Sequence, residues 1–201
     1  MVVMPAKHET TIAAPGEHGR PALALVNSRR NGPSGPIDEL ASTAELCRWL
    51  ENHHVVSVRE CDSAALRSVI ALRGTVRELL LARIEGRTPD PCSLQVVNQA
   101  TAAAPTARHL DWASVDGPSE RRDCLGASGI ALARSLLAAD AIDLVVGPDH
   151  ADLRACGAPG CLRLMLKDHP RRQWCSTRCG DRVRASRYYR RHRPTSGADA
   201  Q

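Results

Sequence analysis

Four cysteines near the C-terminus have the residue type and the spacing of a metal site. They follow the pattern C-x4-C-x13-C-x3-C within RACGAPGCLRLMLKDHPRRQWCSTRCGDR and are Cys156, Cys161, Cys175 and Cys179. Each close pair can present two thiolates from one tight turn, and Gly157, Pro159 and Gly160 suit the first of these turns. The two pairs can therefore converge on one tetrahedral zinc ion with Zn–S bonds of about 2.3 Å.

Such a zinc ion is structural rather than catalytic. Hydrolytic zinc needs an open position for water, and four protein thiolates leave none. The alternative, four ordinary buried thiols, is unfavourable because this polar and basic segment offers little core. Zinc bound to a short peptide supplies about 10–16 kcal/mol, enough to fold such a segment. His150 and His169 flank the cluster, and we interpret them as surface residues rather than replacement ligands.

Four further cysteines are scattered singly through the rest of the chain, and they do not form a second cluster in the sequence. They are Cys47, Cys61, Cys92 and Cys124. We interpret them as core or surface residues, with a redox role for one of them as the alternative. In a reducing compartment, eight cysteines do not indicate four disulfides.

Positive charge is concentrated around the cysteine cluster. Residues 154–193 hold twelve Lys or Arg against two Asp, a net charge of +10, whereas residues 1–153 have a net charge of −4 from fifteen basic and nineteen acidic residues. The stretch GDRVRASRYYRRHR predicts a basic helix, with Val183 and one of Tyr188 and Tyr189 packed on the zinc module. We expect this region to bind nucleic-acid phosphates, and a solvated helix without a ligand is the alternative. The candidate contact residues are Arg171, Arg172, Arg178, Arg182, Arg184, Arg187, Arg190, Arg191 and Arg193.

Helical signals dominate the part of the chain that precedes the cluster. Apolar residues recur at helical spacing, and capping residues mark several ends. The capping signals are Ser42 with Glu45, Asp62, Gly86, and Asp90 with Pro91. The predicted helices span 42–52, 62–86, 90–103 and 130–142. The remaining predictions are a strand or helix start at 22–30, a loop at 31–36 and a short hairpin within 106–122.

Length and composition favour a mainly α protein with two folded parts. The chain has 201 residues, of which 43% are hydrophobic but only 2% aromatic, with no Phe, so the core is built from Leu, Val, Ile and Ala. No stretch reaches the roughly 18 apolar residues that cross a bilayer, and the opening residues contain no apolar secretion signal. We therefore expect a cytoplasmic protein with no membrane partner. The predicted parts are a flexible leader at 1–20, a helical domain at 21–150, a zinc module with its basic helix at 151–193 and a flexible tail at 194–201.

The segment WCSTRCGDRVRASRYYRRHR, together with CGAPGCLRLMLKDHPRRQWC upstream, resembles the CGNR zinc-finger family of bacterial proteins. This resemblance implies that the four clustered cysteines are the metal ligands. Parts of the preceding region resemble the helical ABATE domain, whose name links it to stress-induced transcription regulation. These parts are ALALVNSRR, LCRWL, LRSVIALRGTVRELL and RTPDP to AAAP. Asp181 stands where the family has Asn, and a carboxylate there would repel a phosphate. We expect Asp181 instead to cap the basic helix and to hold Arg182 or Arg184.

These observations together predict a DNA-binding transcription regulator with one structural zinc ion and no catalytic activity. The first alternative is an adaptor whose finger binds RNA or a protein. An enzyme with its active site in the helical domain is the second alternative. It has little support, because the sequence shows no nucleophile elbow, phosphate loop or paired His-Glu metal motif.

Overall fold

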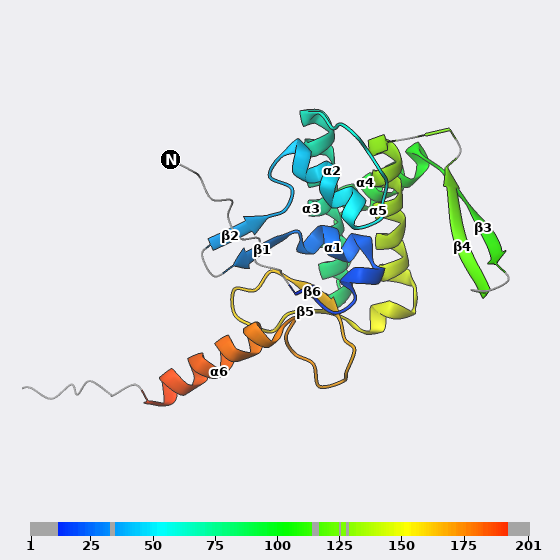
Figure 1. Cartoon of the computed structure of the whole chain (residues 1–201). Coiled ribbons are helices and arrows are strands. Elements are labelled where there is room, and N and C mark those ends of the chain that lie inside the picture. The colour runs from blue at the N-terminus through cyan, green and yellow to red at the C-terminus, as the bar shows by residue number, and fades with distance from the viewer. Residues whose placement is uncertain (1–11, 33–34, 114–116, 125, 128, 193–201) are drawn as a thin grey trace, which may run out of the picture.

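The computed structural model describes residues 12–32, 35–113, 117–124, 126–127 and 129–192. The α-helices are α1 (Pro21–Asn27), α2 (Thr43–Asn52), α3 (Ser63–Glu85), α4 (Pro91–Ala103), α5 (Gly129–Val146) and α6 (Thr177–His192), with short 3-10 helices η1 (Glu17–Gly19) and η2 (Pro148–Ala151). The strands are β1 (Arg29–Gly32), β2 (Gly35–Asp38), β3 (Thr106–Ala113), β4 (Gly117–Cys124), β5 (Leu153–Ala155) and β6 (Leu164–Leu166). They pair as three antiparallel two-stranded sheets, β1–β2, β3–β4 and β5–β6 (Figure 1). The prediction of a mainly α fold is confirmed.

The predicted capping residues mark the ends of the helices. Ser42 Oγ accepts a hydrogen bond from the backbone N–H of Glu45 at 3.2 Å and so begins α2. Asp62 caps α3 in the same way, and Gly86 ends that helix in the left-handed conformation at φ 67°. Asp90 caps α4, where Pro91 is the first helical residue. The predictions for these three helices are confirmed.

The core of the helical part is aliphatic apart from Trp49 and is built around α1, α3 and α5 (Figure 1). Residues 22–27 of α1 are all buried, which explains why residues 22–26, ALALV, are apolar on every face of the helix. Leu72 and Leu80 of α3 and Leu137 of α5 are also fully buried. Each such leucine contributes about 1.5–3 kcal/mol of burial free energy. No helix in the described part of the chain combines the length and apolarity needed to cross a membrane.

The segment 22–38 forms a helix and then a hairpin. The predicted loop at 31–36 is wrong, because Asn31 pairs with Pro36 and Gly32 with Gly35 in the β1–β2 hairpin. The hairpin is held from a distance: Arg73 of α3 donates to both carboxylate oxygens of Asp38, at 2.6 and 2.8 Å. No local pattern in the sequence signals the contact between Arg73 and Asp38. The turn residues of 31–36 were the available signal, and they favour a loop.

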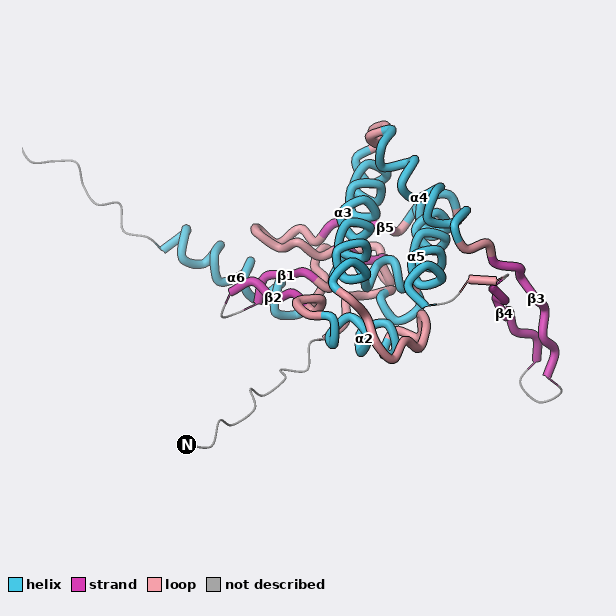
Figure 2. Tube along the Cα trace, turned by 90° about the horizontal axis from the view of Figure 1, so that it is seen from above, coloured by secondary structure: helices cyan, strands magenta, loops and turns pink. Residues whose placement is uncertain are grey.

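The second hairpin, β3–β4, projects away from the helices (Figure 2). Its strands confirm the short hairpin predicted within residues 106–122. Leu110 and Trp112 are 71% and 72% exposed, and the buried core contains none of the described residues of this arm. Next to it, α5 continues to Val146, four residues beyond the predicted helix end at 142.

The predicted flexible leader at 1–20 extends too far, and its residues 1–11 lie outside the described part. Ala14 and Glu17 are buried, and Glu17 begins η1. Glu17 accepts from Arg163 at 3.1 Å, a contact across 146 residues of sequence. The backbone N–H of Leu166 donates to the Pro15 carbonyl at 2.9 Å. These contacts fix the end of the leader against the C-terminal part of the chain.

Candidate metal centre

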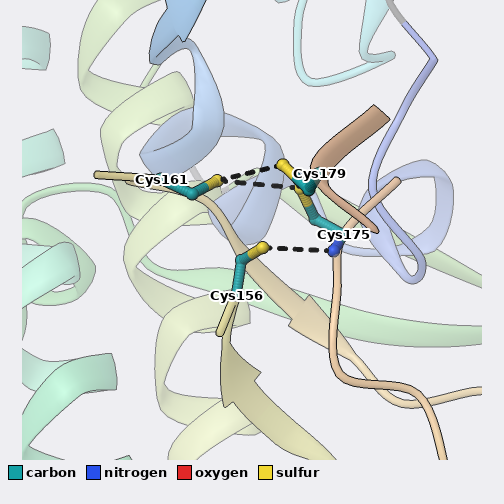
Figure 3. Close-up of side chains that lie close together, drawn as sticks. All are labelled: Cys156, Cys161, Cys175 and Cys179. Atoms are coloured by element: carbon teal, nitrogen blue, oxygen red, sulfur yellow. Dashed lines mark hydrogen bonds between the residues drawn. The ribbon is translucent and has the colours of Figure 1, made fainter. Parts of the chain in front are cut away.

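The four clustered cysteines come from two turns that face each other. Cys156 follows β5 and Cys161 precedes β6, whereas Cys175 lies just before α6 and Cys179 in its first turn (Figure 3). All four sulfur atoms lie within 4.8 Å of one another. Cys161 Sγ is 3.8 Å from both Cys175 Sγ and Cys179 Sγ, and the last two are 3.6 Å apart.

These distances fit a single zinc ion. A tetrahedral ion with Zn–S bonds of about 2.3 Å separates its sulfur ligands by about 3.8 Å. The three sulfur–sulfur distances among Cys161, Cys175 and Cys179 match this value to within 0.2 Å. When bound, the zinc supplies a fixed tetrahedral centre that joins the two turns, and its coordination leaves no position for water.

Backbone hydrogen bonds hold both turns in place. The N–H of Cys161 donates to the Ala158 carbonyl at 3.0 Å, which closes the first turn, and Gly160 takes φ 71° there. The N–H of Cys175 donates to Cys156 Sγ at 3.3 Å and so links the two turns. Ser176 Oγ accepts from the N–H of Cys179 at 3.3 Å, which makes Ser176 the N-cap of α6.

The thiols compete for protons in the absence of a cation. Hydrogen bonds with Cys161 and Cys175 lower the pKa of Cys156 and favour its thiolate. The interaction with Cys156 raises the pKa of Cys161 to about 11 and raises that of Cys175 as well. These shifts favour a thiolate at Cys156 and protons on Cys161 and Cys175, so we expect zinc binding to release protons.

A small apolar cluster supports the site. Val183 of α6 is buried together with Ala14, Ala158 and Met165 around the cysteines. Its predicted packing on the zinc module is confirmed. The prediction that a tyrosine joins it is wrong: Tyr188 and Tyr189 are 60% and 73% exposed. Tyr188 stacks instead on His192, with ring centroids 4.1 Å apart.

Comparison with protein families agrees with this arrangement. Residues 19–148 match the model of the ABATE family, described as a putative stress-induced transcription regulator, over more than half of the chain. The chain belongs to the ABATE family. Residues 153–192 match the CGNR zinc finger. Both resemblances in the sequence are thereby confirmed, and the cofactor of the finger is one structural zinc ion. No curated protein matches the chain.

The ABATE unit (residues 19–148) and the CGNR finger (residues 153–192) share a core. Leu153 and Leu164 of the finger belong to the same buried cluster as α1, α3 and α5 of the ABATE unit. Asn27 Nδ2 donates to the Leu164 carbonyl at 2.8 Å, and Asn27 Oδ1 accepts from the Leu164 N–H at 2.8 Å. Arg77 of α3 donates to the Leu162 carbonyl at 2.6 Å. The sequence alone does not indicate these contacts, because nothing local to Asn27 or Arg77 signals a partner so far along the chain.

The candidate phosphate-binding arginines of the CGNR finger differ in their surroundings. Arg178, Arg187, Arg190 and Arg191 are exposed along α6. Arg171 is exposed in the loop before Cys175, where its N–H donates to His169 Nδ1 at 3.1 Å. Arg193 lies outside the described residues.

Three of the candidate arginines are already engaged with the protein. Arg172 binds both oxygens of Asp168, and this hydrogen bonding lowers the pKa of Asp168. Arg182 donates to the Pro159 carbonyl at 3.0 Å, and Arg184 pairs with Asp181.

The capping role predicted for Asp181 is wrong. Helix α6 begins at Thr177, four residues earlier than Asp181, and Ser176 is its cap. Asp181 lies inside the helix, where its predicted pairing with Arg184 is confirmed at the (i, i+3) spacing. His150 and His169 are not members of the cysteine group. His169 is exposed, as interpreted, whereas His150 is half-buried and its Nδ1 lies 2.7 Å from the Gly147 carbonyl oxygen.

Proposed function

We propose that this ABATE-family protein is a bacterial, cytoplasmic, stress-responsive transcription regulator that binds DNA through α6. The observation that carries the proposal is the fixed base of this helix: Cys175 and Cys179 anchor its first turn, while its remaining length projects from the body (Figure 1). A 16-residue helix is about 24 Å long, which suits the major groove of DNA.

The charge of α6 supports the same proposal. Its described residues include Arg178, Arg182, Arg184, Arg187, Arg190 and Arg191, against Asp181 as the acidic residue. Arginine is suited to phosphate and to guanine edges because its guanidinium donates in a planar fork. Tyr188 and Tyr189 are exposed beside these arginines, where they are available to contact sugars or bases.

We propose no catalytic role for the zinc. Its inferred ligand set is four thiolates, and a fully protein-coordinated tetrahedral ion neither activates water nor polarises a substrate. The zinc instead fixes the start of α6 relative to the ABATE unit. The alternative function, an adaptor that binds RNA or a protein, uses the same exposed arginines, so binding experiments must separate the two.

A gel-shift titration of zinc-loaded protein with duplex DNA and with structured RNA, across a salt series, tests the proposal. If about five arginines neutralise phosphates, log K for duplex DNA falls with log salt at a slope of about −4 to −5. The double variant Arg187→Gln with Arg190→Gln should reduce the magnitude of this slope by about 2. The matched control is Arg59→Gln with Arg67→Gln, two exposed arginines of the ABATE unit. Tighter binding to RNA, or no binding to either nucleic acid, contradicts the proposal.

A further inference from the structure

Two cysteines outside the metal centre lie against each other. Cys47 is in α2, and Cys61 directly precedes Asp62, the N-cap of α3. Their Sγ atoms are 2.7 Å apart, although 14 residues separate them in the sequence. The sequence alone places these cysteines far from each other, and the packing of α2 against α3 brings them together.

Both thiols are within reach of small solutes. Cys47 and Cys61 are each partly exposed. They line the same open surface hollow, together with Thr43, Arg48 and Glu51. A second hollow, lined by Asp62 and Ser68 among others, also reaches Cys61. A small oxidant can therefore approach the pair without any unfolding of the ABATE unit.

We propose that Cys47 and Cys61 are an oxidation site at which a peroxide converts two thiols into a reversible disulfide. In the first step the Cys47 sulfur takes one oxygen from the peroxide, which leaves Cys47 as a sulfenic acid and releases one water or alcohol. In the second step the Cys61 sulfur displaces the hydroxyl group of that sulfenic acid. The S–S bond forms, the Cys61 proton leaves with the hydroxyl as water, and the two thiols have lost two electrons to the peroxide.

The order of these steps follows from the surroundings of Cys61. Burial raises the pKa of the Cys61 thiol to about 12, assisted by its contact with Cys47. Cys61 therefore keeps its proton at neutral pH, and a protonated thiol is a poor nucleophile towards a peroxide. It becomes the resolving partner, because its sulfur is held 2.7 Å from Cys47 Sγ. This proximity offsets its weak nucleophilicity, and its proton passes to the departing hydroxyl group as the S–S bond forms.

The bond would tie two elements of the ABATE unit together. It would join the middle of α2 to the beginning of α3 and close the connection at 53–62 into a loop. Helix α3 contributes Val69, Leu72 and Val76 to the core that the ABATE unit shares with the CGNR finger. The oxidised pair would therefore restrain the helix against which the finger packs. The proposal concerns thiol chemistry and does not depend on DNA binding.

Peptide mapping of the full-length, zinc-loaded chain tests the site. The reduced protein is treated with equimolar hydrogen peroxide, alkylated, and digested with trypsin without reduction. Cleavage after Arg30, Arg48, Arg59 and Arg67 places the two cysteines in separate peptides, 31–48 and 60–67. We expect these peptides to appear cross-linked, about 2 Da lighter than their sum, and to separate again after treatment with dithiothreitol.

Cysteine variants and a measurement of zinc release provide the controls for this test. Cys47→Ser and Cys61→Ser should each abolish the cross-linked peptide, whereas Cys92→Ser, at an exposed cysteine, should leave its yield unchanged. The wild-type digest gives the result even if one variant folds poorly. The proposal is overturned if Cys47 and Cys61 remain fully alkylated after treatment that oxidises Cys92. It is also overturned if a zinc-sensitive dye detects complete zinc release before any cross-link forms.

Discussion

Asn27, the last residue of α1, pairs with both backbone groups of Leu164 in the CGNR finger, each at 2.8 Å. The side-chain amide takes the place of a neighbouring strand for that residue of β6. Both partners are buried, so water cannot replace these hydrogen bonds. One side chain thus completes the backbone pairing of a segment 137 residues away.

We predict that Asn27→Ala destabilises the whole chain. It leaves the buried N–H and carbonyl of Leu164 without partners, which costs about 2–4 kcal/mol of unfolding free energy for the two groups. Urea unfolding of the zinc-loaded protein measures this loss. Asn98→Ala, at an exposed position of α4, is the matched control and should change stability little. Equal stability of the two variants would contradict the role given to Asn27.

Replacement of one clustered cysteine should remove the zinc and the order of α6. Cys175→Ser takes away a buried ligand in contact with two other sulfur atoms. We expect bound zinc to fall well below one per chain and hydrogen-exchange protection to be lost from α6, because zinc supplies most of the folding free energy of such modules. Metal analysis and exchange mass spectrometry check this. Cys92→Ser should retain the metal, and a Cys175→Ser protein with full zinc and unchanged protection refutes the site.

Zinc affinity should rise steeply with pH. Cys161, whose pKa is about 11, and Cys175, whose pKa is also raised, keep their protons at neutral pH until zinc displaces them. Release of at least two protons makes the apparent affinity increase about 100-fold or more per pH unit between pH 6 and 8. Competition with a chelator of known affinity, corrected for the protonation of the chelator itself, measures the slope. A slope near zero would mean that the thiols are already ionised.

The β1–β2 hairpin should lose stability at acid pH through Asp38. Hydrogen bonding to Arg73 lowers the pKa of Asp38, so its stabilising effect is fully present above the ordinary carboxyl pKa of about 3.9. That effect is lost as the pH falls through the lower folded-state pKa. Asp38→Asn should cost about 1–3 kcal/mol at pH 7, because Arg73 is only 6% exposed and loses its charged partner.

Thermal unfolding at pH 7 and pH 3 checks the Asp38 prediction. The difference between wild type and Asp38→Asn should shrink at pH 3, where the wild-type carboxyl begins to protonate. Glu51→Gln, at an exposed position of α2 in the same part of the chain, provides a comparison for removal of a carboxylate. A difference that is constant with pH would exclude ionisation of Asp38 as the cause.

Local signals were sufficient for the helices and for the metal centre. Ser42, Asp62 and Gly86 act within a few residues of their own positions, and the spacing of the cysteines encodes two tight turns directly. The contacts that the sequence does not indicate join residues that are far apart in the chain. Glu17 pairs with Arg163, which is 146 residues away in the sequence. This pairing packs a segment that was predicted to be part of a flexible leader. Such residues come together only when the core packs, so no short stretch of sequence contains both partners.

The connection between the ABATE unit and the CGNR finger has a mechanical consequence. The connection consists of little more than η2. Arg20 holds η2 against α5, because it pairs with Asp149 in η2 and with Asp140 in α5. With no slack in the connection, the two segments should tumble in solution as a single particle with one rotational correlation time.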